Sequence, residues 1–137
     1  MNLVINTDGA SRGNPGPASI GFIIKTDSGV ILHQEGKAIG EATNNVAEYT
    51  AVFKALEYVK KYLSKKPING ISFFLDSMLV VEQLSGRYKI KNNHLKSIFD
   101  QVKSLELELG KITYTHVPRE QNFIADRLAN KALDDAK

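Results

Sequence analysis

The sequence contains no cysteine and no long apolar run. Without cysteine, the chain forms neither disulfides nor thiolate metal sites. No run approaches the roughly 20 apolar residues that a membrane-spanning helix requires, and the N-terminus lacks the basic-then-apolar order of a signal peptide. Internal repeats, linkers and low-complexity segments are also missing from the sequence. From these absences we expect a cytoplasmic protein that does not bind a membrane.

Length and composition both fit a single globular domain. The chain has 137 residues, of which 42% are hydrophobic and 24% are charged, and both proportions are ordinary for soluble domains. Folding at this length buries roughly two-thirds of the surface of the unfolded chain, which is enough for one core. We therefore expect one domain over residues 1–137, and a monomer on size alone. The net charge of +3 permits an anionic partner without requiring one.

The apolar pattern changes along the chain from strand-like to helical. Asn2–Asp8 is typical of a strand that ends in an Asp-Gly turn, and Ala18–Gly40 of a hairpin turning at TDSG. Helices and strands then alternate. The expected helices cover Asn44–Leu63, Ser77–Gly86, His94–Leu109 and Glu120–Ala136, and the expected strands cover Ile71–Asp76 and Lys111–Val117. This order predicts an α/β domain with a mixed sheet, in which an antiparallel hairpin side is followed by parallel βαβ crossovers.

Four carboxylates occupy similar places in this arrangement. Asp8 and Asp76 each end an apolar strand, while Glu48 and Asp126 lie in the first turns of helices. Ligands of open α/β sheets collect at the carboxyl ends of strands, where helices begin. Acids drawn together there repel one another unless a cation lies between them, and hard oxygen ligands favour Mg²⁺ or Mn²⁺.

Three of these acids also have common structural interpretations. Asp8 precedes a glycine and suits an ordinary turn. Asp76 suits a cap for the helix that follows, as does Ser77. Asp126 suits the positive end of a helix dipole. Taken one at a time, each of these roles is commoner than catalysis.

Glu48 has both a structural interpretation and a position that favours a metal site. It stands three residues after Asn45, so the pair could form a capping box. It also lies four residues before Val52 and so extends the helical stripe that packs on the sheet. Burying an unpaired charge there is costly, and a metal shared with the strand-end aspartates would supply the partner.

The sequence resembles type 1 ribonuclease H in four segments, which match the family's motifs in order and spacing. They are TDGASRGNPGPASIGFII, ATNNVAEYTAVFKALE, FFLDSMLVVEQLSG and VPREQNFIADRLANKAL. The match runs nearly end to end and is closest to the short prokaryotic and archaeal-like branch. It implies a ribonuclease H-like fold, with a five-stranded mixed sheet flanked by helices. It also implies cleavage of the RNA strand of RNA–DNA hybrids to 5′-phosphate and 3′-hydroxyl ends.

The family's acidic quartet maps onto Asp8, Glu48, Asp76 and Asp126, which the resemblance makes catalytic ligands of two Mg²⁺ ions, with Mn²⁺ as a substitute. Asp8 and Asp76 would contact both ions or lie between them. Glu48 would hold the metal on the leaving-group side, near the ribose 2′-hydroxyl. Asp126 would complete the site of the water-activating metal.

The resemblance also implies substrate-binding residues next to the acids. They are Gly9, Ala10, Ser11, Arg12, Gly13, Asn14, Thr43, Asn44, Asn45, Ser77 and Met78. The two glycines would let the backbone approach ribose, and the three asparagines match positions that contact the minor groove. Thr43 matches a position that touches a DNA phosphate. Met78 matches a base-contacting position, with an ordinary packed or exposed methionine as an equal alternative.

The segment before the last acid departs from the better-known family pattern. Many bacterial relatives carry a histidine there in a long loop, whereas VPREQNFIAD is short and has none. Arg119 or Glu120 could assist product release or proton movement instead. Tyr88–Leu95 is too short for the basic handle of some relatives, so we expect only a weak, salt-sensitive phosphate-binding edge.

Other functions fit the sequence less well. A non-catalytic nucleic-acid-binding domain on the same fold is the main alternative, but such a domain gains little from four acids close to phosphates. A resolvase or transposase core shares the acids without predicting TDGASRGNPGP or TNNVAEY. A P-loop enzyme is excluded, because no Gly-Lys-Ser/Thr follows the glycines.

Overall fold

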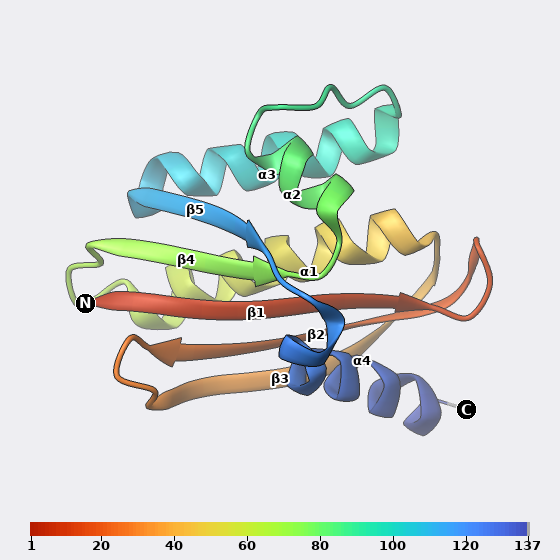
Figure 1. Ribbon diagram of the computed structural model, residues 1–137, viewed down its shortest axis with the longest axis horizontal. Helices are drawn as coiled ribbons and strands as arrows, with labels where there is room; N and C mark the ends of the chain where they lie inside the picture. The colour runs from red at the N-terminus through yellow and green to blue at the C-terminus, as the bar shows by residue number, and fades with distance from the viewer. Residues whose placement is uncertain (137) are drawn as a thin grey trace.

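Five strands form one mixed sheet in the computed structural model, which describes residues 1–136 (Figure 1). The strands are β1 (Asn2–Ser11), β2 (Gly16–Thr26), β3 (Ile31–Ala42), β4 (Gly70–Leu75) and β5 (Lys111–His116). Their order across the sheet is β3-β2-β1-β4-β5. The β1–β2 and β2–β3 pairs are antiparallel, and the β1–β4 and β4–β5 pairs are parallel. This arrangement confirms the predicted fold class.

Helices cover both faces of the sheet. They are α1 (Asn44–Tyr58), α2 (Met78–Leu84), α3 (Asn93–Leu109) and α4 (Phe123–Asp135), with a π-helical turn η1 (Val59–Leu63) after α1 and a 3-10 turn η2 (Arg119–Gln121) before α4. In Figure 1, α1 lies behind the sheet and α4 lies in front of it, where it packs on β1, β2 and β3. None of the helices in residues 1–136 combines the length and the apolarity needed to cross a bilayer.

The main core lies between the sheet and α1. Alternate side chains of β1, β2 and β4 point to it, because side chains two residues apart on a strand share a face. They include Leu3, Ile5, Ile20, Phe22, Ile24, Ile71, Phe73 and Leu75. On α1 the predicted stripe is buried as far as Val59. The wider turn of η1 then shifts the helical phase, so that Tyr62, at the end of the expected helix, is exposed.

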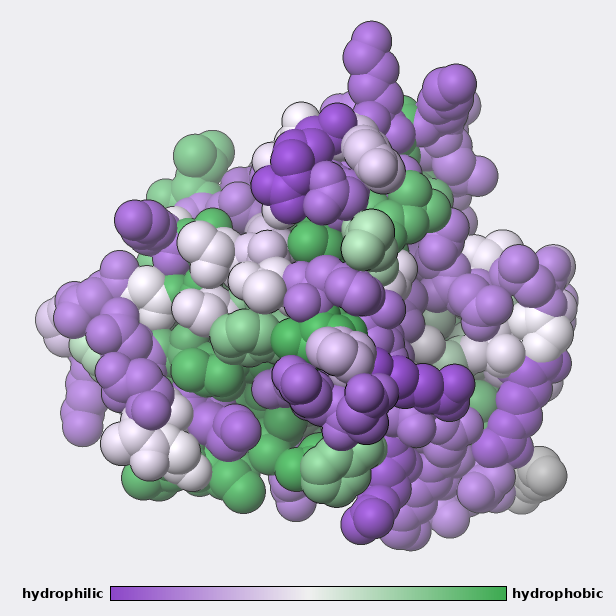
Figure 2. All heavy atoms as spheres, in the orientation of Figure 1, coloured by the Kyte–Doolittle hydropathy of each residue, from purple (hydrophilic) through white to green (hydrophobic). Residues whose placement is uncertain are grey.

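On the opposite face, α4 separates polar from apolar surface. Its small residues Ala125 and Ala129 are buried against the sheet, and its outer side is hydrophilic (Figure 2). Apolar surface gathers beside the helix in the same view, over the part of the sheet that α4 leaves open. Burial of the apolar side of α4 therefore fixes the direction in which Asp126, in the first turn of the helix, points.

Two glycines allow the helices to approach the sheet closely. A Cβ on Gly9 would lie 2.3 Å from the carbonyl carbon of Ala47 and 2.3 Å from the backbone nitrogen of Glu48. A Cβ on Gly21 would lie 2.3 Å from the carbonyl oxygen of Ala125. All three distances are far shorter than a carbon contact allows. The glycines thus bring α1 and α4 against the sheet beside the predicted acids.

The first strand is longer than the sequence predicts. Asp8 does not end β1, because Ala10 and Ser11 pair with Ser19 and Ala18 of β2. The turn is confined to residues 12–15 and contains a cis Asn14–Pro15 peptide bond. The Asp-Gly turn signal is overridden because β2 supplies backbone partners for the residues that follow it.

Candidate active site

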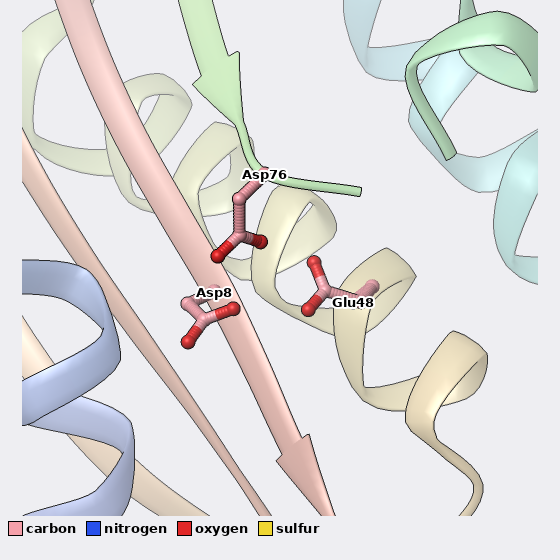
Figure 3. A group of neighbouring side chains, drawn as sticks. All are labelled: Asp8, Glu48 and Asp76. Carbon is pink, nitrogen blue, oxygen red and sulfur yellow. The ribbon is translucent and has the colours of Figure 1, made fainter. Parts of the chain in front are cut away.

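β1 and β4 stop pairing just before the predicted aspartates. The last pair of their parallel ladder is Asn6 with Phe74. Asp8 and Asp76 each lie two residues further along the chain, so both side chains point to the face that α4 covers. Glu48 reaches the same place from α1, and the three carboxylates point toward one another (Figure 3). One oxygen from each lies within 4.8 Å of the others.

Glu48 is held in this group by the backbone of β1. The Gly9 N–H donates a hydrogen bond of 3.0 Å to Glu48 Oε1. The cap of α1 is Thr43, whose hydroxyl accepts from the Val46 N–H at 3.2 Å, so the capping-box interpretation of Glu48 is wrong. The Glu48 residue is only 7% exposed, and its Oε2 has no hydrogen-bond partner within residues 1–136. A buried carboxylate oxygen without a partner fits a ligand to a cation.

Asp126 completes the wall of the same cavity from α4, although it lies outside the group of three. Its Oδ1 accepts from Asn130 Nδ2 at 3.1 Å and lies 3.5 Å from Arg119 Nη2. The cavity has a volume of about 490 Å³. Its lining residues are Asp8, Gly9, Ala10, Ser11, Asn44, Glu48, Asp76, Arg119, Asp126 and Asn130. All four predicted acids therefore face one space.

Burial and mutual repulsion raise the pKa values of the three grouped acids. Burial, followed by the charge of Glu48, raises the pKa of Asp8 to about 10. Burial raises the pKa of Glu48 to about 7, and the hydrogen bond from the Gly9 N–H opposes that rise. Burial also raises the pKa of Asp76, and the charge of Arg119 opposes that rise. The group therefore retains protons at neutral pH unless a cation offsets its charge. The oxygen donors present are those that Mg²⁺ and Mn²⁺ prefer.

Comparison with known proteins identifies the family. The family described as "Reverse transcriptase-like" matches residues 6–132. Ribonuclease H of Rickettsia akari is 33% identical over 152 residues, which cover 98% of this chain and 92% of that protein. This chain belongs to the ribonuclease H family.

Solved structures of ribonuclease H share the whole fold. LC11-RNase H1, crystallised in complex with an RNA/DNA hybrid, superposes with a TM-score of 0.94 at 41% identity, over 98% of each chain. The chain is also 44% identical to the Bifunctional protein Rv2228c of Mycobacterium tuberculosis, over an alignment of 137 residues that covers 99% of this chain. It spans only 36% of the length of that relative.

Several predicted substrate-binding residues of this ribonuclease H domain lie next to the acids. Gly9, Ala10, Ser11 and Asn44 line the acid cavity. A neighbouring cavity of about 410 Å³ is lined by Asn14, Thr43, Asn44, Asn45, Val46, Asn92, His94 and Leu95. Asn44 belongs to both cavities, and its N–H donates to Asn14 Oδ1 at 3.0 Å. The two cavities are therefore adjacent and share Asn44.

Other predicted residues have different surroundings. Arg12 turns to α4, where its Nη2 lies 2.6 Å from Asp134 Oδ1. Ser77 caps α2, because its hydroxyl accepts from the Val80 N–H. Met78 is exposed at the first position of that helix.

The two accessory candidates, Arg119 and Glu120, also have different surroundings. Arg119 lines the acid cavity, whereas Glu120 is exposed on η2. Of the two accessory candidates, the structure therefore brings only Arg119 to the acids.

Sequence reasoning missed three asparagines that surround the four acids. Asn130 bonds Asp126, and Asn122 bonds both Asn6 and the carbonyl oxygen of Thr7. Asn122 directly precedes α4, where an asparagine is typical of an ordinary helix cap. Its sequence position therefore carries no signal of the contacts that it makes.

Proposed function

We propose that this chain is a divalent-metal-dependent ribonuclease H that hydrolyses the RNA strand of RNA–DNA hybrids. The group of three carboxylates, with its unpartnered buried oxygen on Glu48, carries the proposal. The similarity to LC11-RNase H1, which was crystallised in complex with an RNA/DNA hybrid, supports such a hybrid as the substrate of this chain. The products would carry 5′-phosphate and 3′-hydroxyl ends.

Asp8, Glu48, Asp76 and Asp126 would hold two Mg²⁺ ions, for which Mn²⁺ could substitute. When bound, such a pair supplies an activated water and stabilises the leaving 3′-oxygen of an in-line displacement. The chain's own contribution is to present the ligands in fixed positions. The Gly9 N–H keeps one oxygen of Glu48 turned to β1, which leaves the second oxygen for a cation.

Hybrid recognition would use the two adjacent cavities. The backbone at Gly9, Ala10 and Ser11 borders the acids, where it could approach the ribose 2′-hydroxyl that distinguishes RNA from DNA. Thr43 and the asparagines around it line the neighbouring cavity, which suits a phosphate of the DNA strand and the minor groove of the hybrid. The neighbouring cavity offers uncharged hydrogen-bonding groups, whereas the acid cavity would repel phosphate in the absence of metal.

Arg119 would assist the step after cleavage. Its guanidinium lies 3.5 Å from the Asp126 carboxylate, and its side chain is 77% exposed, so it is accessible to a product phosphate. We assign to it the assistance in product release or proton movement for which many relatives use a histidine. Glu120, which is exposed on η2, has weaker support for that role.

A cleavage assay with matched variants tests the proposal. Labelled RNA annealed to DNA is incubated with Mg²⁺, Mn²⁺ or EDTA and with wild type, Asp8→Asn, Asp76→Asn or Asp100→Asn. The control Asp100 lies on α3, where it pairs with Lys96 on the surface. We expect wild type and the control to cleave only with metal, and each active-site variant to lose at least about 100-fold.

Each contrary result has a separate meaning. Hybrid binding by wild type without metal-dependent cleavage would refute the enzyme and leave the non-catalytic binding domain. Equal cleavage by wild type and both active-site variants would indicate a contaminating nuclease. Single-stranded and double-stranded RNA in parallel lanes measure the breadth of the substrate, and phosphatase treatment of the products identifies their ends.

A further inference from the structure

One buried residue, Asn122, links the two segments that carry Asp8 and Asp126. Asn122 is 1% exposed although it stands at the start of a surface helix. Its Nδ2 donates to the carbonyl oxygen of Thr7 at 2.8 Å, and its Oδ1 accepts from Asn6 Nδ2 at 3.1 Å. The amide thus ties the residue that precedes α4 to β1.

These contacts use both ends of the carboxamide. An asparagine side chain offers two N–H donors and a carbonyl acceptor. Here one donor serves Thr7 and the acceptor receives Asn6. A buried amide that is hydrogen-bonded through both its nitrogen and its oxygen is held in one orientation.

The backbone of Asn122 connects the network to the fourth acid. Its carbonyl oxygen accepts from the Asp126 N–H at 3.1 Å, which forms the first turn of α4. Asn122 is the N-cap residue of that helix, yet its side chain makes no capping hydrogen bond. An asparagine at this position normally caps the helix, so here the side chain has been diverted from the helix to the sheet.

We infer that Asn122 is a positioning residue, which holds Asp8 and Asp126 at the spacing that divalent cations require. The inference rests on the proposed function. The bond to Thr7 fixes the β1 backbone immediately before Asp8, at the point where β1 leaves its ladder with β4. The backbone bond fixes the turn that carries Asp126. Glu48 lies outside this network, because the Gly9 N–H holds it separately.

The consequence is a defined kinetic pattern. Residues that orient metal ligands typically contribute 10–100-fold to metal affinity or activity when removed. Asn122 does not line the cavity through which substrate reaches the acids, so hybrid binding should change little. Loss of the amide should therefore raise the metal concentration needed for activity without a matching change in KM.

The test compares Asn122→Ala and Asn122→Asp with wild type and with Val102→Ala. The aspartate has the shape of asparagine but lacks both N–H donors. Val102 is fully buried in α3, away from the acid cavity, so its truncation controls for a general loss of stability. Mn²⁺ binding to each protein is followed by electron paramagnetic resonance, which requires no cleavage. Hybrid cleavage is then measured against Mg²⁺ concentration.

Both Asn122 variants should bind Mn²⁺ about 10–100-fold more weakly than wild type and need a similarly higher Mg²⁺ concentration for half-maximal activity. Their KM for hybrid should stay within about threefold of wild type, and Val102→Ala should keep the wild-type metal affinity. Wild-type Mn²⁺ affinity in a folded Asn122 variant would overturn the inference and leave a purely structural residue. If the alanine variant does not fold, the aspartate variant decides.

The two proposals fail in different ways. A wild type that binds Mn²⁺ but cleaves no hybrid would overturn the proposed function alone, because the Mn²⁺ titration still reports the effect of Asn122 on the acids. A wild type that binds no Mn²⁺ would overturn both.

Discussion

Asp8→Asn should stabilise the metal-free protein while it abolishes hybrid cleavage. Asp8 is 5% exposed, and its carboxylate lies within 4.8 Å of oxygens of Glu48 and Asp76. Asparagine keeps the shape of the side chain, removes one charge and adds an N–H group that can donate to a neighbouring carboxylate. The effects on stability and on activity therefore have opposite signs.

The size of the gain follows from the spacing of the acids. Two unit charges at this separation repel by about 3 kcal/mol at an effective dielectric constant of ~20. The group retains protons at neutral pH, so only part of this repulsion is present in the folded protein. We expect Asp8→Asn to raise the free energy of unfolding by about 1–3 kcal/mol at pH 8 in EDTA, and Tm by roughly 3–10 °C.

The gain should depend on pH in a defined direction. The Asp8 carboxyl ionises near pH 4 in the unfolded chain, whereas its pKa in the folded protein is raised to about 10. Between these values the folded protein binds the proton more tightly, so wild-type stability falls as pH rises through this window. The variant lacks this titration, and its advantage should be small at pH 5 and larger at pH 8.

Thermal unfolding followed by circular dichroism measures this difference, with EDTA at both pH values. Asp100→Asn, which changes an exposed ion pair, should stay within about 0.5 kcal/mol of wild type at each pH. Saturating Mg²⁺ should then raise the Tm of wild type and much less that of Asp8→Asn. An Asp8→Asn protein that is less stable than wild type at pH 8, or an advantage that does not change with pH, would refute the reasoning.

Three further variants test the surroundings of the site. Gly9→Ala places a Cβ 2.3 Å from the carbonyl carbon of Ala47, so we expect at least about 2 kcal/mol of destabilisation and weaker cleavage; an unchanged Tm would contradict the close contact. Arg119→Ala changes an exposed side chain, so stability should stay within about 0.5 kcal/mol while the turnover number falls about tenfold or more; unchanged turnover would exclude the accessory role. Thr43→Ala removes the cap of α1 and should cost about 1 kcal/mol; its hybrid affinity, measured against salt concentration, should also fall, and an unaltered affinity would argue against the phosphate contact.

Local sequence patterns predict most of the architecture, because apolar periodicity and turn residues act over a few positions. The strands and helices occur in the predicted order, and their ends differ by a few residues. The main difference in the sheet is β1, which continues to Ser11 past an Asp-Gly turn signal. Its partners there belong to β2, and a local signal carries no information about tertiary pairing.

The candidate site is predictable to a different extent. The buried position of Glu48 follows from its place on the α1 stripe, and the approach of Asp8 to Asp76 follows from the rule that sites form at the carboxyl ends of parallel strands, here where the ladder between β1 and β4 ends. The role of Asn122 could not be predicted, because its partner Thr7 is 115 positions away in the chain. The catalytic role of each acid and the single-domain organisation stay predictions.

The position of the acids follows from the architecture and not from attraction between them. β1 keeps its pairing with β2 beyond Asp8, while its ladder with β4 ends at Asn6, so the strand stays fixed on one side and opens on the other. Gly9 admits α1 on one face of this opening, and Gly21 admits α4 on the other. Packing of the two helices then forces acids together that would otherwise separate. The raised pKa values show that burial and mutual repulsion disfavour the charged acids in this arrangement. Removing a charge should therefore stabilise the fold, and a cation that binds there should do the same.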